Sequence, residues 1–116
     1  MNIEELREFC LSLKAVTEDI KWTDNLVFSI AGKMFCLAGL EPPLQVTLKV
    51  PEDQFDELTQ SAEIIQGSHC ARRKWMTILD ESRFGRAEWE QYILQSYRLV
   101  ISKLPQKTRE NIGTDD

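Results

Sequence analysis

The sequence predicts the α+β fold class: a two-layer sandwich in which a mainly antiparallel sheet carries helices packed on one face. Helix-period segments flank a strand-rich middle, and the strand-like runs there follow one another through short turns. The 116 residues, 42% hydrophobic and 28% charged, have the size and composition of one ordinary globular domain. We therefore predict a single domain over residues 1–107, followed by a polar, frayed tail over residues 108–116.

A first helix is predicted over residues 3–14. Asn2 and Glu5 have the spacing of a capping box, in which the two side chains satisfy free N–H groups at a helix start. Apolar residues recur at helical spacing and form one stripe: Ile3, Leu6, Cys10 and Leu13. Such a stripe packs on another apolar surface, and the predicted sheet supplies one.

The middle of the chain is rich in strand signals. Residues 26–31 and 34–40 are β-rich runs joined at Gly32-Lys33, which predicts a hairpin with a short turn. After Pro42-Pro43, residues 44–50 alternate apolar and other side chains, so this strand has one buried face and one wet face.

Two further helices enclose one more strand. The second helix begins at Pro51 and ends near Ala62, and residues 75–79 are predicted to be a strand. A long helix then runs from about residue 86 until Pro105, because proline cannot continue a helix. Its apolar stripe consists of Trp89, Ile93, Tyr97, Val100 and Leu104.

Secretion and membrane insertion are not expected. The N-terminus lacks the positive and apolar regions of a secretion signal, and the longest apolar run, residues 34–40, is far shorter than the roughly 18 residues that a membrane span needs. Cys10, Cys36 and Cys70 are odd in number and widely spaced, which is typical of reduced thiols in a cytoplasm. We expect Cys10 and Cys36 to fill the core, whereas cations beside Cys70 favour a more reactive thiol.

The net charge of -5 conceals a basic segment. Residues 1–67 carry twelve acidic and five basic side chains, whereas residues 68–86 carry two acidic and five basic ones. Positive charge concentrated in one segment of an acidic protein can direct an anionic partner to one place. The candidate phosphate-binding residues come from this segment and from the predicted hairpin tip: Lys33, Arg72, Arg73, Lys74, Arg83 and Arg86.

Trp75 directly follows the basic triplet Arg72-Arg73-Lys74. If its ring is exposed, it can stack on a nucleic-acid base, which suits single strands. If its ring is buried, it is an ordinary core residue of the predicted strand. The sequence leaves both interpretations open.

Three stretches carry a family resemblance. Phe28-x-x-Ala31-Gly32-Lys33-Met34-Phe35, Gly67-Ser68-His69-x-x-Arg72-Arg73-Lys74-Trp75-x-Thr77-Ile78 and Ser96-Tyr97-x-Leu99-Val100-x-x-Lys103-Leu104-Pro105 together resemble the MmcQ/YjbR family of bacterial proteins. The resemblance implies a fold akin to that of frataxin and CyaY, no known enzyme activity, and a double-wing likeness for which the family is labelled DNA-binding. At Ser68, Ala71 and Lys74 the chain departs from the family pattern, so a change of ligand preference is an open alternative.

Two classes of non-catalytic function follow. The first is weak, non-specific DNA binding, in which basic side chains contact phosphates and Lys33 acts as a wing. The acidic total charge and the absence of a recognition-helix or RNP signature argue against tight or sequence-specific binding. The second is a protein-binding or regulatory module, for which Trp22 is the candidate anchor because tryptophan is enriched at binding hot spots. Core packing is the competing interpretation of Trp22.

Catalysis, metals and cofactors are not expected. His69 is the single histidine, and no acid is placed by sequence to orient its ring toward the neighbouring Cys70. Cysteine and histidine do not cluster at zinc-ligand spacing, and the glycines form no phosphate loop. The frataxin-like resemblance raises iron binding by Glu4, Glu5 and Glu8, although a solvated helix face explains these acids equally well.

Overall fold

The computed structural model describes residues 1–67 and 75–113. The predicted site residues Arg72, Arg73 and Lys74, together with His69 and Cys70, lie outside the described residues. In chain order the elements are α1 (Ile3–Ser12), β1 (Val16–Lys21), β2 (Asn25–Ile30), β3 (Lys33–Gly39), β4 (Val46–Lys49), α2 (Glu52–Leu58), β5 (Ile64–Gln66), β6 (Trp75–Ile78), the 3-10 turn η1 (Glu81–Arg83), α3 (Arg86–Ser102) and α4 (Gln106–Ile112).

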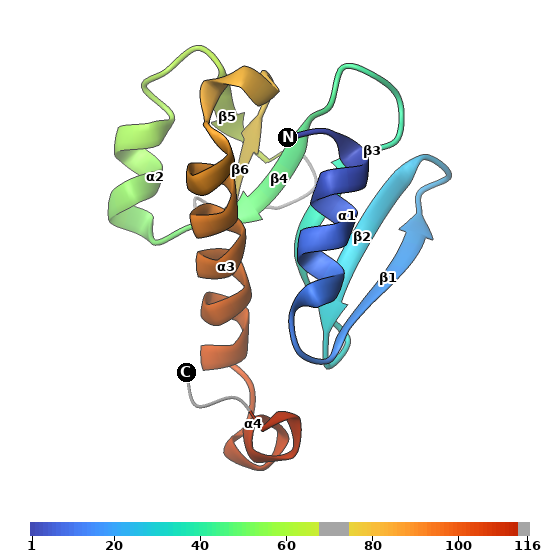
Figure 1. The fold of residues 1–116 in the computed structure, drawn as a ribbon. Coiled ribbons are helices and arrows are strands. Elements are labelled where there is room, and N and C mark those ends of the chain that lie inside the picture. Colours follow the sequence, from blue (N-terminus) through green and yellow to red (C-terminus); the bar gives the residue numbers. More distant parts are fainter. Residues whose placement is uncertain (68–74, 114–116) are drawn as a thin grey trace.

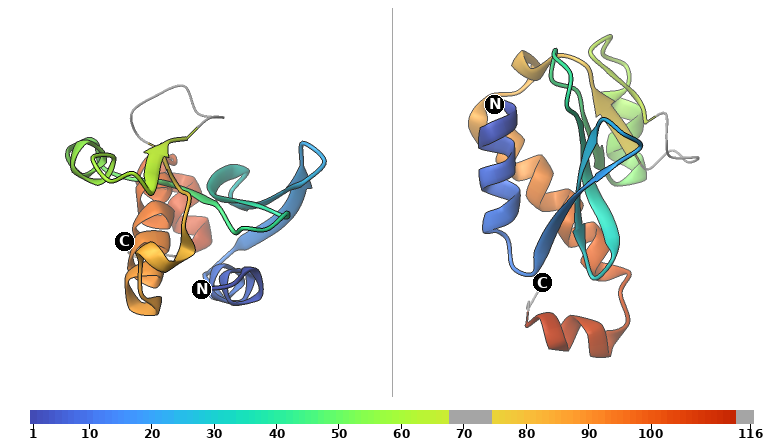
Figure 2. Two further views of the ribbon diagram at one scale, coloured as in Figure 1. Left: turned by 90° about the horizontal axis from the view of Figure 1, so that it is seen from above. Right: turned by 90° about the vertical axis from the view of Figure 1, so that its right-hand side faces the viewer.

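The strands form one antiparallel sheet in the order β1-β2-β3-β4-β6-β5. Helices α1 and α3 lie on the same face of this sheet, and α2 lies near its β5–β6 end (Figures 1 and 2). The predicted α+β sandwich, mainly antiparallel with helices on one face, is confirmed. None of the described helices is both long enough and apolar enough to span a membrane.

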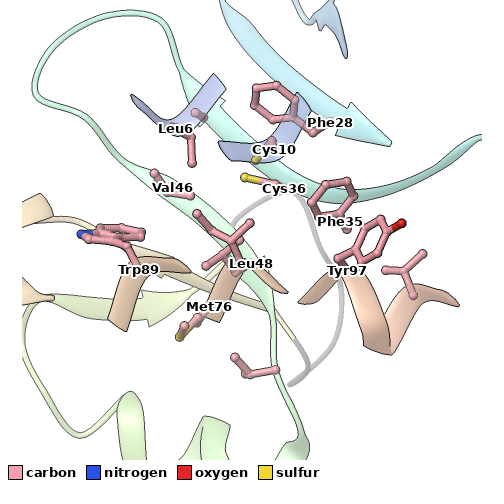
Figure 3. Packing of buried hydrophobic residues seen from close by; sticks show 14 of the residues in the cluster. Leu6, Cys10, Phe28, Phe35, Cys36, Val46, Leu48, Met76, Trp89 and Tyr97 are labelled. Atoms are coloured by element: carbon pink, nitrogen blue, oxygen red, sulfur yellow. The ribbon is translucent and has the colours of Figure 1, made fainter. Parts of the chain in front are cut away.

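The core lies between the sheet and the two covering helices. Leu6 and Cys10 of α1 meet Phe28 and Cys36 of the sheet, and Trp89 of α3 is also buried there (Figure 3). Fully burying one such large apolar side chain stabilises the fold by about 1.5–3 kcal/mol. The prediction that Cys10 and Cys36 fill the core is confirmed, since both are free thiols with no exposed surface.

Helix α3 is fixed to the sheet by a buried hydroxyl. The Ser96 Oγ donates to the carbonyl of Phe35 in β3 and accepts the backbone N–H of Lys49 in β4 at 2.9 Å. Near the same end of the helix, the Tyr97 hydroxyl donates to the carbonyl of Lys14 at 2.6 Å. The two Ser96 bonds hold the C-terminal half of α3 against β3 and β4, so they determine which α3 residues lie beside those strands.

Two strands were not predicted. β1 is almost wholly exposed, and its turn into β2 places Trp22 at φ 52° and Thr23 at φ 73°, a left-handed backbone that usually takes asparagine or glycine. β5 has only three residues, too few to show the alternating pattern of a strand in the sequence. α2 also ends at Leu58, earlier than the predicted Ala62.

The frayed tail was predicted over residues 108–116, but residues 108–112 belong to α4, so the prediction is wrong for that part; residues 114–116 lie outside the described residues. The helix begins after Pro105, whose ring suits a helix start, and ends at Gly113 in the left-handed conformation with φ 77°. The Gly113 N–H donates to the carbonyl of Arg109 at 3.1 Å, and Ile112 packs against the core. This one apolar anchor and the glycine cap explain why the polar segment is ordered.

Candidate nucleic-acid interface

Two of the predicted site residues, Lys33 and Trp75, line one cavity of about 270 Å³. Two further lysines, Lys49 and Lys103, line the same cavity, and its apolar wall consists of Met34, Val100 and Leu104. We call Lys33, Lys49, Trp75 and Lys103 the lysine groove. Lys33 follows the β2–β3 turn and Lys103 follows α3, and Figures 1 and 2 show that turn beside the C-terminal end of α3.

Backbone register brings the lysine groove together. Lys49 is the last residue of β4 and pairs directly with Trp75, the first residue of β6, so the two side chains share one face of the sheet. Lys33 follows the Ala31-Gly32 turn, in which both residues have positive φ, 51° and 77°. Lys103 caps the C-terminal end of α3, where the helix dipole favours a cation.

The groove is electropositive. Among the described residues that line it, three are lysines and none is acidic. The Lys49 ammonium nitrogen lies 5.9 Å from the centroid of the Trp75 ring, within the range of a cation–π contact. Lys33 and Lys103 are exposed, and within residues 1–67 and 75–113 no ion pair involves either of them.

Trp75 is half-buried and does not belong to the core cluster, so the core interpretation of this residue is wrong. Its carbonyl accepts the N–H of Gly67 at 3.0 Å. A Cβ on Gly67 would lie 3.1 Å from Thr47 Cγ2 and 3.3 Å from Trp75 Cβ, so glycine permits β5 to run this close to the tryptophan. Backbone packing thus fixes the base of the side chain, and the residue as a whole stays partly exposed.

Arg83 and Arg86 lie elsewhere. Arg86 opens α3, so it stands at the far end of that helix from Lys103, about 25 Å away at 1.5 Å per residue. Its guanidinium pairs with Glu5 of α1 and with Glu90 at 3.1 Å. Arg83 lies over the Phe84 ring, 5.3 Å from its centroid. The structure therefore does not join these two arginines to Lys33 and Trp75 in one patch.

Sequence reasoning missed Lys49 and Lys103. Each has an ordinary local explanation, at the end of an alternating strand and at the C-terminus of a helix. Their meeting depends on the β4–β6 register and on the docking of α3 through Ser96, which no local pattern reveals. Lys74, by contrast, precedes Trp75 in the sequence and belongs to the predicted basic triplet outside the described residues.

The acidic face of α1 has structural roles. Glu5 completes the capping box with Asn2, and this backbone hydrogen bond, followed by the nearby Arg86 guanidinium, lowers the pKa of the Glu5 carboxyl. In the part of the chain that the structure describes, no group of three histidine, cysteine or acidic residues is arranged to hold a metal ion. The arrangement therefore gives the iron alternative, with Glu4 and Glu8, no supporting geometry.

The fold and the groove define a small open-sheet α+β protein with a basic, tryptophan-lined surface. A family model described as YjbR matches residues 11–99, and the chain belongs to that family. The resemblance found in the sequence is thus confirmed. No curated protein matches the chain.

Solved structures of similar proteins agree with this assignment. Deinococcus radiodurans protein DR2400, described as carrying the domain DUF419, is 26% identical, with a TM-score of 0.91 over 99% of this chain and 90% of its own. A Pseudomonas syringae protein is 21% identical, with a TM-score of 0.72 over 85% of this chain and 98% of its own, and shows the same fold.

Proposed function

We propose that this protein binds nucleic acid weakly and without sequence preference through the lysine groove. The observation that carries the proposal is that three lysines and a half-buried tryptophan line one cavity, with no carboxylate among the described lining residues and with the Lys49 ammonium 5.9 Å from the centroid of the Trp75 ring. No catalytic step is part of the proposal. The basic triplet Arg72-Arg73-Lys74 is a candidate extension, because it immediately precedes Trp75 in the chain.

The lysines of the groove suit contact with phosphates rather than recognition of base edges. A lysine ammonium is a compact point charge that can contact a phosphate oxygen but carries little base information. If each lysine of the groove contacts one phosphate, the slope of log K against log salt is about -2.7 on duplex DNA and about -2.1 on a single strand. This small number of contacts, in a chain of net charge -5, supports weak binding that is lost at moderate salt.

The test compares two charge-matched double variants. Lys33→Ala/Lys103→Ala removes two exposed groove lysines, and Lys14→Ala/Lys107→Ala removes two exposed lysines outside the groove. Anisotropy titrations with fluorescent duplex and single-stranded DNA at low salt should show the groove variant losing about two units of salt slope on duplex DNA. The control should keep the wild-type slope. Equal losses in both variants, or no binding by the wild type, would contradict the proposal.

The contribution of the basic triplet needs its own variant. Arg72→Ala/Arg73→Ala/Lys74→Ala should weaken binding further if these residues contact phosphates beyond the groove. If the triplet variant loses binding while the groove variant keeps it, the site lies in the triplet and the groove assignment is wrong.

A second candidate function, a protein-binding module, is favoured by one observation. Trp22 is 56% exposed, so it is available as the anchor considered from the sequence rather than as a core residue. Raising salt separates the two candidates, because nucleic-acid binding through lysines weakens steeply whereas an apolar protein contact persists.

A further inference from the structure

The strand β1 forms an open edge of the sheet. Among the strands that the structure describes, only β2 pairs with it, and Figure 1 draws no helix or strand beyond its other side. Its side chains are exposed after Val16, including Ile20 at 57%, and Trp22 in the adjoining turn is 56% exposed. An open edge with exposed apolar groups is a template on which another strand can pair.

The hydrogen-bonding groups of this edge are accessible. The Ile20 N–H donates to the carboxylate of its own neighbour Asp19 at 2.8 Å, which indicates that the amide faces outward rather than toward β2. A strand pairing at Ile20 would replace this local contact with a backbone carbonyl and release the Asp19 carboxylate. Alternate residues of a strand direct their backbone groups to the same side, so the amide of Glu18 shares this orientation.

The charges of β1 are complementary to β1 itself. In an antiparallel pair of two β1 strands centred on Ile20, the two Ile20 residues lie opposite each other. Lys21 of each copy then lies opposite Asp19 of the second copy, which gives two cross-strand ion pairs. Within the described residues, no ion pair already involves Asp19 or Lys21.

We propose that β1 is a self-association surface, on which a second copy of this chain pairs antiparallel about Ile20 to continue the sheet across both copies. The twofold axis of this pairing is perpendicular to the sheet, so the helices of both copies stay on one face. Helix α1 lies over the sheet rather than beyond β1, and the edge remains accessible (Figures 1 and 2). A second copy fits better than an unrelated strand because the register sets Asp19 and Lys21 of each copy opposite their counter-charges while joining the two Ile20 side chains, and Glu18 is already paired with Arg7 of its own chain.

This proposal is independent of nucleic-acid binding, so its test contains none. Sedimentation equilibrium of the wild-type chain over a wide concentration range should show a reversible monomer–dimer equilibrium. Lys21→Glu places a glutamate opposite Asp19 of the second copy at both ends of the interface and should weaken dimerisation about tenfold or more. The swap Asp19→Lys/Lys21→Glu restores opposite charges in the same register and should recover most of the affinity.

The control is Lys107→Glu, an exposed charge reversal on α4 that should leave dimerisation unchanged. Circular dichroism verifies that each variant is folded, as expected for exposed positions. A wild type that stays monomeric at millimolar concentration overturns the proposal. So does a dimer that Lys21→Glu leaves intact, or a charge swap that restores no affinity, because either result excludes this register.

Discussion

Lys49 and Trp75 lie opposite each other on β4 and β6, with the ammonium nitrogen 5.9 Å from the centroid of the indole ring. This pair joins a cation to an aromatic face on the surface of the sheet away from the core. Such a pair offers a cation for a phosphate oxygen and an aromatic ring for a base. The tryptophan should therefore matter more for single strands, whose bases are free to stack.

Trp75→Ala should weaken the binding of single-stranded DNA by about 1–3 kcal/mol, because one base loses its aromatic platform. Trp75→Phe keeps an aromatic face and should retain most of the affinity. Anisotropy titration of the three proteins with a fluorescent oligothymidine measures the effect. If the Trp75→Ala protein binds as tightly as the wild type, base stacking has no part in the interaction and the lysines alone account for binding.

The buried Ser96 hydroxyl should contribute more to stability than its size suggests. Ser96→Ala removes the donor to the Phe35 carbonyl and the acceptor of the Lys49 N–H, leaving both backbone groups unsatisfied. Urea denaturation should show a loss of about 1–3 kcal/mol in the free energy of unfolding. Ser102→Ala, an exposed hydroxyl bonded to the nearby Leu99 carbonyl, should change it by less than about 0.5 kcal/mol.

The elements predicted successfully from the sequence have strong local signals. Asn2 and Glu5 form the capping box as predicted, and the hairpin at Gly32 has a turn residue suited to positive φ. β1 was not predicted, because this exposed strand lacks the alternation of apolar and polar residues and because Trp22-Thr23 is not a sequence that normally adopts a left-handed turn. Local sequence patterns thus identify elements that their own residues specify. They miss elements, such as β1, that form because of pairing with a neighbouring strand.

The candidate site was predictable only in part. Lys33 and Trp75 stood out as a hairpin-tip cation and a tryptophan beside basic residues, and the structure places them in one groove. Lys49 and Lys103 join them through strand register and helix docking, which are long-range properties of the fold. Arg86 was included because it is close in sequence to the basic triplet, yet its guanidinium is paired with Glu5 on another helix.

The turn between β1 and β2 should be open to stabilisation. Thr23 is β-branched and adopts φ 73°, where its side chain crowds the backbone, so Thr23→Gly should relieve this strain and raise the free energy of unfolding by about 1 kcal/mol. Thr17→Gly, in the extended part of β1, should instead lower it by about the same amount, since glycine there only adds entropy to the unfolded chain. Thermal and urea denaturation of both variants provide the comparison. A destabilised Thr23→Gly protein would show that the threonine side chain makes contacts that outweigh its backbone strain.

The buried Cys36 thiol should make the fold sensitive to alkali. Burial raises the pKa of the Cys36 thiol well above its ordinary value of 9.0, and the neighbouring Cys10 thiol raises it further. The folded state therefore keeps a proton that the unfolded chain releases above about pH 9, so stability is intact below that pH and falls as the pH rises past it. In a Cys70→Ser background, the free energy of unfolding from urea titrations at pH 7 to 10.5 should decline more steeply than in the same background with Cys36→Ala.

Ellman's reagent should react with neither Cys10 nor Cys36 at pH 8 until urea unfolds the chain, since both thiols are fully buried. Two results would show that water and hydroxide reach this part of the core. One is rapid labelling of either thiol in the folded protein, and the other is an equal decline of unfolding free energy with pH in the Cys70→Ser protein and in the same protein with Cys36→Ala.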